Sequence, residues 1–115
     1  MSMSCPFCQI RDRTLPAECV YEDEEILGFN DIHPQAPVHL LVIPKRHIPS
    51  IEALTETDAG LVGRMIRVAA QLAQERGVSS EGYRLVINCN AWGGQTVFHL
   101  HLHLLAGRPM NWPPG

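Results

Sequence analysis

The apolar residues in the middle of the chain predict one long helix. They recur at helical spacing, at Leu61, Val62, Met65, Ile66, Ala69, Leu72 and Ala73. Thr55 or Thr57 is suited to cap the start, and Asp58 favours a helix N-terminus. Gly77 is suited to end the helix. Because the apolar positions form one stripe, we expect this helix to pack on a sheet.

Shorter apolar runs on both sides of this helix predict strands. They cover residues 19–21, 26–30 and 38–43 before it, and residues 83–89 and 97–105 after it. Residues 7–13 predict a short helix that ends before Pro16, and the proline-containing stretch 33–37 predicts a loop. The order of strands, helix and strands predicts an α+β fold with a largely antiparallel sheet.

Composition narrows the functional classes. The 115 residues suit a single compact domain over residues 1–115, and the apolar share of 45% is that of a globular protein. A net charge of −3 without a basic block argues against wrapping nucleic acid, although one site for a small phosphorylated ligand stays open. The N-terminal residues lack a signal-peptide pattern, and the run 38–43 is too short to span a membrane. We therefore expect a cytoplasmic protein with no membrane partner.

The last predicted strand carries the clearest chemical signal. Three histidines, His99, His101 and His103, alternate with leucines there. Side chains alternate between the two faces of a strand, so the imidazoles are expected on one face and the leucines against the helix. The alternative is a polar surface or an adventitious metal-binding tract, but histidine is seldom used for a plain surface strand.

Imidazole suits phosphoryl chemistry. A neutral ring has one bare nitrogen, which can attack phosphorus when the other nitrogen is held by an acceptor. Neighbouring rings can donate hydrogen bonds to the phosphoryl oxygens. The preceding Gly93-Gly94-Gln95-Thr96 offers close backbone approach and side-chain donors, although a pair of glycines alone is more often a simple turn.

Residues 99–105 match the motif His-φ-His-φ-His-φ-φ, with φ apolar, and so the chain resembles the histidine-triad (HIT) family. The resemblance to the Hint branch of that family extends over nearly the whole chain. It is carried by Cys5-Pro6-Phe7-Cys8, Phe29-Asn30-Asp31-Ile32, residues 39–47, Asn88, residues 93–96 and the tail 107–115 with its Trp-Pro-Pro-Gly ending. It implies a HIT-like fold, a five-stranded antiparallel sheet with one long and one short helix, and pairing as a homodimer.

The same resemblance implies a purine nucleoside phosphoramidase. In the family, the residue at the position of His101 attacks the α-phosphorus and forms a nucleotidyl-histidine, which water hydrolyses to a nucleoside 5′-monophosphate, preferably AMP. His103 is implied to bind phosphate oxygens, and His39 to complete the catalytic cluster. A P–N bond suits this chemistry, because protonated nitrogen leaves as a neutral amine. Other branches of the family act on dinucleoside polyphosphates.

The resemblance also implies the substrate-binding residues. Asp31 is expected to accept hydrogen bonds from the ribose, and Asn88 to lie on the leaving-group side. The remaining expected contacts are Phe7, Ile10, Phe29, Asn30, Ile32 and Leu41 around the purine, and Gln95, Thr96 and Val97 around the phosphate and the leaving group. Many Hint proteins have Asn-Glu-Gly where this chain has Asn-Cys-Asn at residues 88–90, and some have histidine at the position of Asn30, so those contacts are expected to differ.

Cys5 and Cys8 have the spacing of half a tetrahedral zinc site. The resemblance supplies His47 and His99 as the other two ligands, and a filled four-ligand site is structural. The alternatives are free thiols, or a redox pair, which lacks a thioredoxin-like surrounding pattern. Cys19 and Cys89 fall in apolar stretches and are expected in the core, and His33 is expected at the surface.

Three readings of the whole chain follow. The first is the enzyme; the second is a non-catalytic nucleotide-binding or scaffold protein that uses the same pocket. The third is a zinc-dependent structural domain in which the histidines serve only metal, and it predicts more than one metal ion per chain. Replacing His101 separates them, since the enzyme then loses turnover and keeps binding.

Overall fold

The computed structural model describes residues 4–115. In chain order, the elements are α1 (Pro6–Arg11), β1 (Cys19–Glu22), β2 (Ile26–Asn30), β3 (Val38–Pro44), α2 (Ala59–Glu75), β4 (Arg84–Val86) and β5 (Leu102–Ala106). Short 3-10 turns lie at residues 51–53, 56–58 and 91–93. The predicted lack of a signal peptide rests in part on residues 1–3, which lie outside the described residues.

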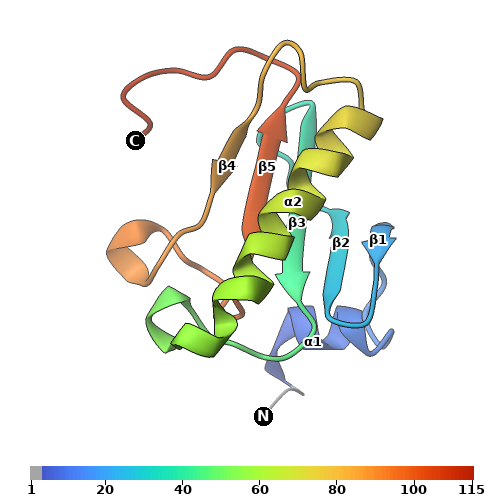
Figure 1. The fold of residues 1–115 in the computed structure, drawn as a ribbon, viewed down its shortest axis with the longest axis vertical. Helices are drawn as coiled ribbons and strands as arrows, with labels where there is room; N and C mark the ends of the chain where they lie inside the picture. The colour runs from blue at the N-terminus through green and yellow to red at the C-terminus, as the bar shows by residue number, and fades with distance from the viewer. Residues whose placement is uncertain (1–3) are drawn as a thin grey trace.

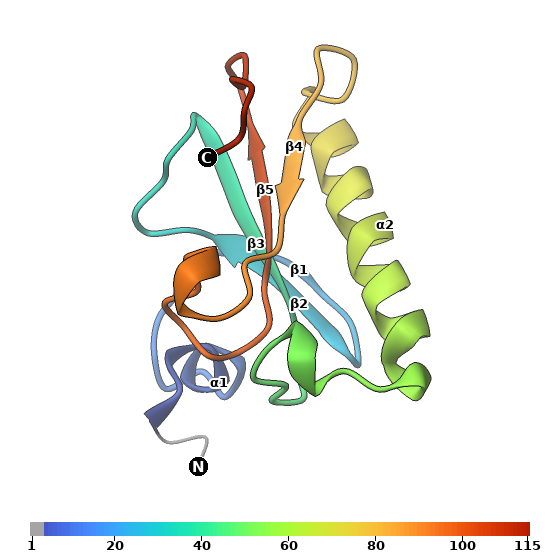
Figure 2. The ribbon, with the colours of Figure 1, turned by 90° about the vertical axis from the view of Figure 1, so that its left-hand side faces the viewer.

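The strands form one antiparallel sheet in the order β1-β2-β3-β5-β4. The long helix α2 runs along one face of the sheet, and α1 lies on the other side, near one end (Figures 1 and 2). This arrangement confirms the predicted α+β class, with five antiparallel strands, one long helix and one short helix.

The alternation of side chains along the central strands separates two apolar clusters. The larger cluster joins one face of the sheet to α2 and includes Leu40, Val42, Met65, Ala69, Leu72, Leu100, Leu102 and Leu104. The smaller cluster joins the opposite face to α1 and includes Phe7, Ile10, Leu27, Phe29, Leu41 and Ile43. Burial on both faces explains why β3 is apolar at successive positions.

The predicted signals set the ends of α2. The carboxylate of Asp58 accepts the backbone N–H of Thr55 at 2.9 Å, so the two residues brace the 3-10 turn that leads into the helix. Gly77 follows the helix with φ +72, a left-handed conformation that glycine adopts without strain. The predicted stripe is buried at Leu61, Met65, Ala69, Leu72 and Ala73, whereas Ile66 is exposed.

Two strands are shorter than predicted. The ladder of β5 begins only at Leu102, opposite Val42, so His103 lies on the strand while His99 and His101 precede it. Pro44 has no N–H to extend the ladder, and the N–H of Leu100 donates to the carbonyl of Ile48 instead. β4, predicted over residues 83–89, covers only 84–86, because it pairs with the shortened β5. The alternation of faces nevertheless persists, since Leu100 lies in the cluster under α2.

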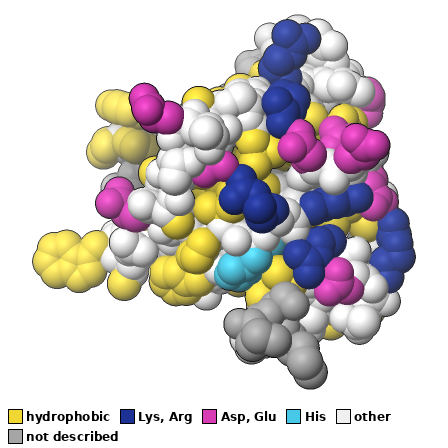
Figure 3. Space-filling view, turned by 60° about the horizontal axis from the view of Figure 1, so that its bottom comes forward, with side chains coloured by type: hydrophobic (Ala, Val, Ile, Leu, Met, Phe, Trp, Pro, Cys, Tyr) yellow, Lys and Arg dark blue, Asp and Glu magenta, His cyan; other side chains and the backbone are white. Residues whose placement is uncertain are grey.

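The surface bears on several of the remaining expectations. Within residues 4–115, no helix is both long enough and apolar enough to cross a membrane. On the end of the molecule that carries α1, basic and acidic side chains are interspersed (Figure 3), and they form ion pairs such as Arg13–Glu22 and Lys45–Glu22. The prediction for Cys19 and Cys89 was wrong: Cys19 opens the edge strand β1 and is exposed, and Cys89 is half-buried.

Candidate active site

Three histidines meet on the face of the sheet that carries α1. His39 comes from β3, His103 from β5, and His101 from the extended segment just before β5. Nε2 of His39 lies 2.9 Å from Nδ1 of His103, and the rings of His101 and His103 have centroids 4.9 Å apart. His39 and His101 are buried, and His103 is half-buried. The structure therefore brings together the three residues predicted to be catalytic.

A main-chain carbonyl sets the tautomer of His101. Nδ1 of His101 lies 2.7 Å from the carbonyl oxygen of His99, and a carbonyl only accepts hydrogen bonds. Nδ1 therefore carries the proton, and Nε2 keeps its lone pair. His101 lines the cavity described below, so the ring supplies a bare nitrogen to whatever binds there.

A main-chain N–H sets the tautomers of the other two rings. The N–H of Gln35 donates to Nδ1 of His39 at 3.0 Å, so a neutral His39 carries its proton on Nε2. That proton is donated to Nδ1 of His103, which leaves the proton of His103 on Nε2. Nε2 of His103 is buried and has no hydrogen-bond partner among residues 4–115. A phosphoryl oxygen is a suitable acceptor for this donor.

Burial keeps the cluster neutral. Desolvation lowers the pKa of His101 and of His39 below the usual range, and the nearby carboxylate of Asp31 opposes both shifts. Burial, together with the adjacent imidazoles, lowers the pKa of His103 to about 4. At neutral pH these rings therefore have the bare nitrogen and the N–H donor that the tautomers assign to them.

An apolar cavity of about 610 Å³ opens beside the cluster. Phe7 and Phe29 meet edge to face in its wall, with ring centroids 5.4 Å apart. Of the predicted contacts, the lining contains Phe7, Ile10, Phe29, Asn30, Asp31, Ile32, Leu41, Thr96, Val97, His101 and His103. It also contains Pro6, Leu15, Pro16, Ala17 and His33, which sequence reasoning missed. His33 is exposed, as predicted, and lies at this cavity.

Polar groups lie at one side of the cavity. Asp31 accepts the N–H of His33 at 2.8 Å, and its other carboxylate oxygen lies 3.4 Å from Nε2 of His39. The amide nitrogen of Asn30 donates to the carboxylate of Glu18 at 2.8 Å. Because a carboxylate only accepts, this bond orients the amide and leaves the oxygen of Asn30 as a second acceptor beside Asp31.

Two predicted contacts lie elsewhere. Gln95 is buried, accepts the N–H of Asn90 at 2.8 Å, and donates to the carbonyls of Pro49 and Val97. Its amide therefore joins three loop segments and is not part of the cavity lining. Asn88 lies against Gly94, whose φ of +89 turns the chain there, and lines a separate hollow next to the C-terminal tail.

A second group of side chains surrounds the start of α1. The ligand atoms of Cys5, Cys8, His47 and His99 all lie within 4.8 Å of one another. Cys8 Sγ lies 3.3 Å from Nδ1 of His47, and the two Nδ1 atoms of His47 and His99 are 3.2 Å apart. Nε2 of His99 donates to the carbonyl of Pro44 at 2.8 Å, so its Nδ1 is bare and faces the thiols.

Asp31, His39 and His103 form another group with ligand atoms within 4.8 Å of one another. Here the hydrogen bonds oppose metal binding. His39 uses Nδ1 to accept from Gln35, and its Nε2 carries a proton, so the neutral ring has no lone pair left for a metal ion. This group is therefore not suited to a second metal ion, and its donor for an anion is Nε2 of His103.

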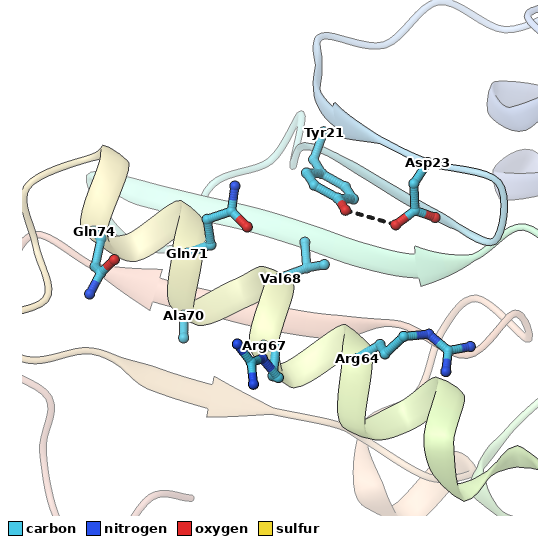
Figure 4. A pocket seen from close by; sticks show the side chains of 8 residues that line it. All are labelled: Tyr21, Asp23, Arg64, Arg67, Val68, Ala70, Gln71 and Gln74. Atoms are coloured by element: carbon cyan, nitrogen blue, oxygen red, sulfur yellow. Dashed lines mark hydrogen bonds between the residues drawn. The ribbon is translucent and has the colours of Figure 1, made fainter.

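A further hollow of about 600 Å³ lies between α2 and the β1–β2 turn (Figure 4). Tyr21 donates to Asp23 at 2.7 Å there, and Arg64 and Arg67 project from the helix. Among the described residues that line this hollow, there is no histidine or cysteine. The histidine cluster lies on the opposite face of the sheet, beside the cavity next to α1.

Comparison with known proteins agrees with this assignment. Residues 4–112 match the family model described as "Scavenger mRNA decapping enzyme C-term binding". A HIT family hydrolase from Legionella pneumophila is 53% identical, with a TM-score of 0.95 over 97% of this chain and 100% of that chain. The fold is that of this group of hydrolases, and the chain belongs to the histidine triad family.

Two other relatives bear on the chemistry. The purine nucleoside phosphoramidase of Escherichia coli is 45% identical over 105 residues, which cover 91% of this chain and 88% of the relative. A zinc-bound histidine triad family protein from Mycobacterium smegmatis is 36% identical, with a TM-score of 0.80 over 94% of this chain and 78% of that chain.

Proposed function

We propose that this protein hydrolyses nucleoside 5′-phosphoramidates, preferably of adenosine, and releases the nucleoside 5′-monophosphate through a covalent nucleotidyl-histidine. One observation carries the proposal: a buried, neutral His101 whose bare Nε2 faces an apolar cavity, beside a buried N–H donor of His103 that has no partner among the described residues. The name of the Escherichia coli relative supports the phosphoramidate as substrate.

The proposed reaction has two displacements. Nε2 of His101 attacks the α-phosphorus, the P–N bond breaks, and the leaving nitrogen takes a proton from solvent water, so that the amine leaves neutral. A water molecule then attacks the same phosphorus, the bond to His101 breaks, and the monophosphate leaves while the proton of the attacking water returns to solvent. His103 donates to a phosphoryl oxygen in both steps, and His39 holds His103 in the donating tautomer. Asp31 and the oxygen of Asn30 accept from the ribose hydroxyls, and the Phe7–Phe29 wall takes the purine.

Mass spectrometry during turnover tests this proposal. The protein and a His101→Ala variant are mixed with an adenosine phosphoramidate and quenched in acid-free denaturant. We expect an adenylyl adduct and AMP from the parent and neither from the variant, which still binds AMP. Absence of both adduct and AMP from the parent would favour the non-catalytic nucleotide-binding protein. Turnover of diadenosine polyphosphates without turnover of phosphoramidates would assign the dinucleoside polyphosphate hydrolysis expected of other branches of the family.

We also propose that Cys5, Cys8, His47 and His99 hold a structural zinc ion, as the zinc-bound relative suggests. A tetrahedral zinc ion with ordinary bond lengths separates its ligand atoms by about 3.3–3.8 Å. Four of the separations between ligand atoms in the group, 3.2 to 3.5 Å, suit such an ion. Burial beside Cys5 raises the pKa of Cys8, a shift that a bound cation reverses.

The zinc ion would supply no reaction step. It would connect α1, which carries Phe7 of the cavity wall, to His99, whose carbonyl orients His101. Because protein side chains would supply all four ligands, no coordination position would be left for a substrate. Free thiols suit a reducing compartment, so the cytoplasm stays the predicted location.

A homodimer through the β4 edge is the proposed assembly. Among residues 4–115, β4 pairs only with β5, so its other edge is open there, and its three residues are half-buried. The open edge lies beside a hollow lined by the C-terminal tail, where Trp112 is exposed. An open strand edge pairs readily with a second copy. Sedimentation of the protein and of a Leu85→Pro variant tests this, since proline blocks the edge and should yield monomer.

A further inference from the structure

The start of the C-terminal tail lies directly against the loop that precedes β3. The guanidinium of Arg108 donates to the carbonyl oxygen of Gln35 at 3.0 Å, although the two residues are 73 positions apart. Next to it, a Cβ at Gly107 would lie only 2.7 Å from Cβ of Pro37, and Gly107 has φ +93. Only glycine allows the tail to pass this close to the ring of Pro37, so the tail and the loop hold each other in position.

The same loop residue reaches the histidine cluster through its other main-chain group. The N–H of Gln35 donates to Nδ1 of His39, while its carbonyl accepts from Arg108. Gln35 itself is exposed. Gln35 therefore acts through its main chain: its carbonyl is bound by the tail, and its N–H is bound by His39.

The tautomer of His39 decides what His103 offers to a ligand. With its proton on Nε2, His39 donates to Nδ1 of His103, and Nε2 of His103 is a donor. In the opposite tautomer, the proton on Nδ1 of His39 would face the N–H of Gln35. His103 would then donate to His39 and present a bare nitrogen to the anionic phosphoryl oxygens. Loss of the Gln35 contact thus converts an attractive group into a repulsive one.

We infer that Arg108 is a positioning residue for the triad: by holding Gln35, it keeps His39 and His103 in the tautomers that give the phosphate a hydrogen-bond donor. The tautomers are properties of the free protein, so this inference is testable whether or not the proposed phosphoramidase activity is correct. Its effect on rate rests on the proposed function.

Nitrogen-15 NMR of the histidine side chains tests the inference. In the protein, we expect Nδ1 of both His39 and His103 to have the chemical shift of an unprotonated nitrogen. Arg108→Met keeps the apolar stem and removes the donors, so both rings should move to averaged shifts of mixed tautomers. Arg108→Lys, which keeps one donor, should restore part of the difference. Unchanged tautomers in both variants would overturn the inference.

Two controls separate this effect from a general loosening of the tail. Arg84 donates to the carbonyl of Asn111 in the same tail, at 2.7 Å, whereas Arg108 donates to the loop itself. Arg84→Met should therefore leave the tautomers of His39 and His103 unchanged; mixed tautomers in this variant would overturn the assignment to Arg108. Gln35→Ala removes the side chain and keeps both main-chain bonds, so it should also preserve the tautomers.

Kinetics add a second readout. With an adenosine phosphoramidate, Arg108→Met should lower kcat about three- to tenfold with little change in KM. The reason is that the N–H of His103, which this variant loses in part, acts on charge that develops in the transition state. Absence of turnover by the parent protein would reject the proposed function and leave the tautomer result intact. A raised KM with unchanged kcat and unchanged tautomers would reject the positioning role.

Discussion

The ring of Phe7 meets the ring of His101 edge-on, with centroids 5.1 Å apart and planes inclined at 89°. The next residue along α1 is Cys8, whose sulfur lies 3.3 Å from Nδ1 of His47. One turn of helix therefore contacts the proposed nucleophile on one side and belongs to the proposed zinc site on the other. This arrangement makes the two sites separable by mutation.

Phe7→Leu should lower kcat/KM about three- to tenfold, since an aromatic pair of this geometry is worth about 0.5–1.5 kcal/mol and the ring restrains His101. Its zinc content should not change, because leucine keeps α1 packed. Phe29→Leu is the matched control: Phe29 contacts Phe7, and no ring contact with His101 is found for it. That variant should raise KM with kcat unchanged. Equal effects of both variants on kcat would contradict a specific role for Phe7.

Acid should destabilise the protein through His103. Its pKa is about 4 in the folded protein and 6.5 in an unfolded chain, so between these values the unfolded chain binds more protons. The free energy of unfolding therefore decreases as the pH falls from about 6.5 towards about 4. Urea unfolding across this range should show a shallower decrease for His103→Gln than for the parent. Parallel pH dependences would mean that His103 is not held neutral.

Zinc removal should lower the melting temperature. Cys8→Ser is expected to lose the metal and to melt at least about 5 °C lower, because a structural ion contributes directly to folding. A chelator should reproduce this loss in the parent and have no further effect on the variant. Cys19→Ser, at an exposed cysteine, is the matched control and should retain one zinc per chain. If the metal-free parent protein kept its melting temperature, zinc would not contribute to the stability of the fold.

Gln95→Ala should act on stability and not on substrate affinity. It leaves the N–H of Asn90 and the carbonyls of Pro49 and Val97 without their partner, at a cost of about 1–3 kcal/mol. Thr96→Ala, at a residue that lines the cavity, should do the reverse and raise KM with little loss of stability. A large increase in KM without destabilisation in Gln95→Ala would show that this side chain contacts the substrate, as the resemblance implied.

Asp58→Ala should destabilise the protein by about 1–2 kcal/mol in urea unfolding. The buried carboxylate accepts from Thr55 and pairs with Arg46, so its loss leaves the start of α2 without its brace. Asp58→Asn keeps an acceptor for Thr55 and should lose less. Both variants should keep the parental kcat, because α2 covers the face of the sheet opposite the triad.

Local patterns predicted the features that depend on local geometry. The alternation of side chains along the last strand predicted that the three histidines and the leucines Leu100 and Leu102 point to opposite faces of the sheet. This alternation holds even though the ladder begins only at Leu102. The period of the long helix and its end signals placed α2. The length of β5 was overestimated, because pairing depends on Pro44 and Ile48 of a distant segment, which no local pattern reveals.

The outline of the cavity depended on contacts between distant segments. Leu15 and Ala17 follow α1 and form one side of it, whereas Asp31 and His33 come from the loop after β2. Their meeting is a property of the chain's path and leaves no spacing signal. The surroundings of Gln95 are another example: its position beside the motif predicts a ligand contact, whereas in the structure its amide makes three hydrogen bonds to the surrounding loops.

The imidazoles of this protein receive their proton arrangement from the main chain: His99 from the carbonyl of Pro44, His101 from the carbonyl of His99, and His39 from the N–H of Gln35. A main-chain carbonyl is present whichever side chain occupies the position, and a main-chain N–H is present at every residue except proline. Substitution of the exposed side chain of Gln35 therefore leaves the N–H that orients His39 in place. The proton arrangement of the cluster is in this way insulated from side-chain changes at its border.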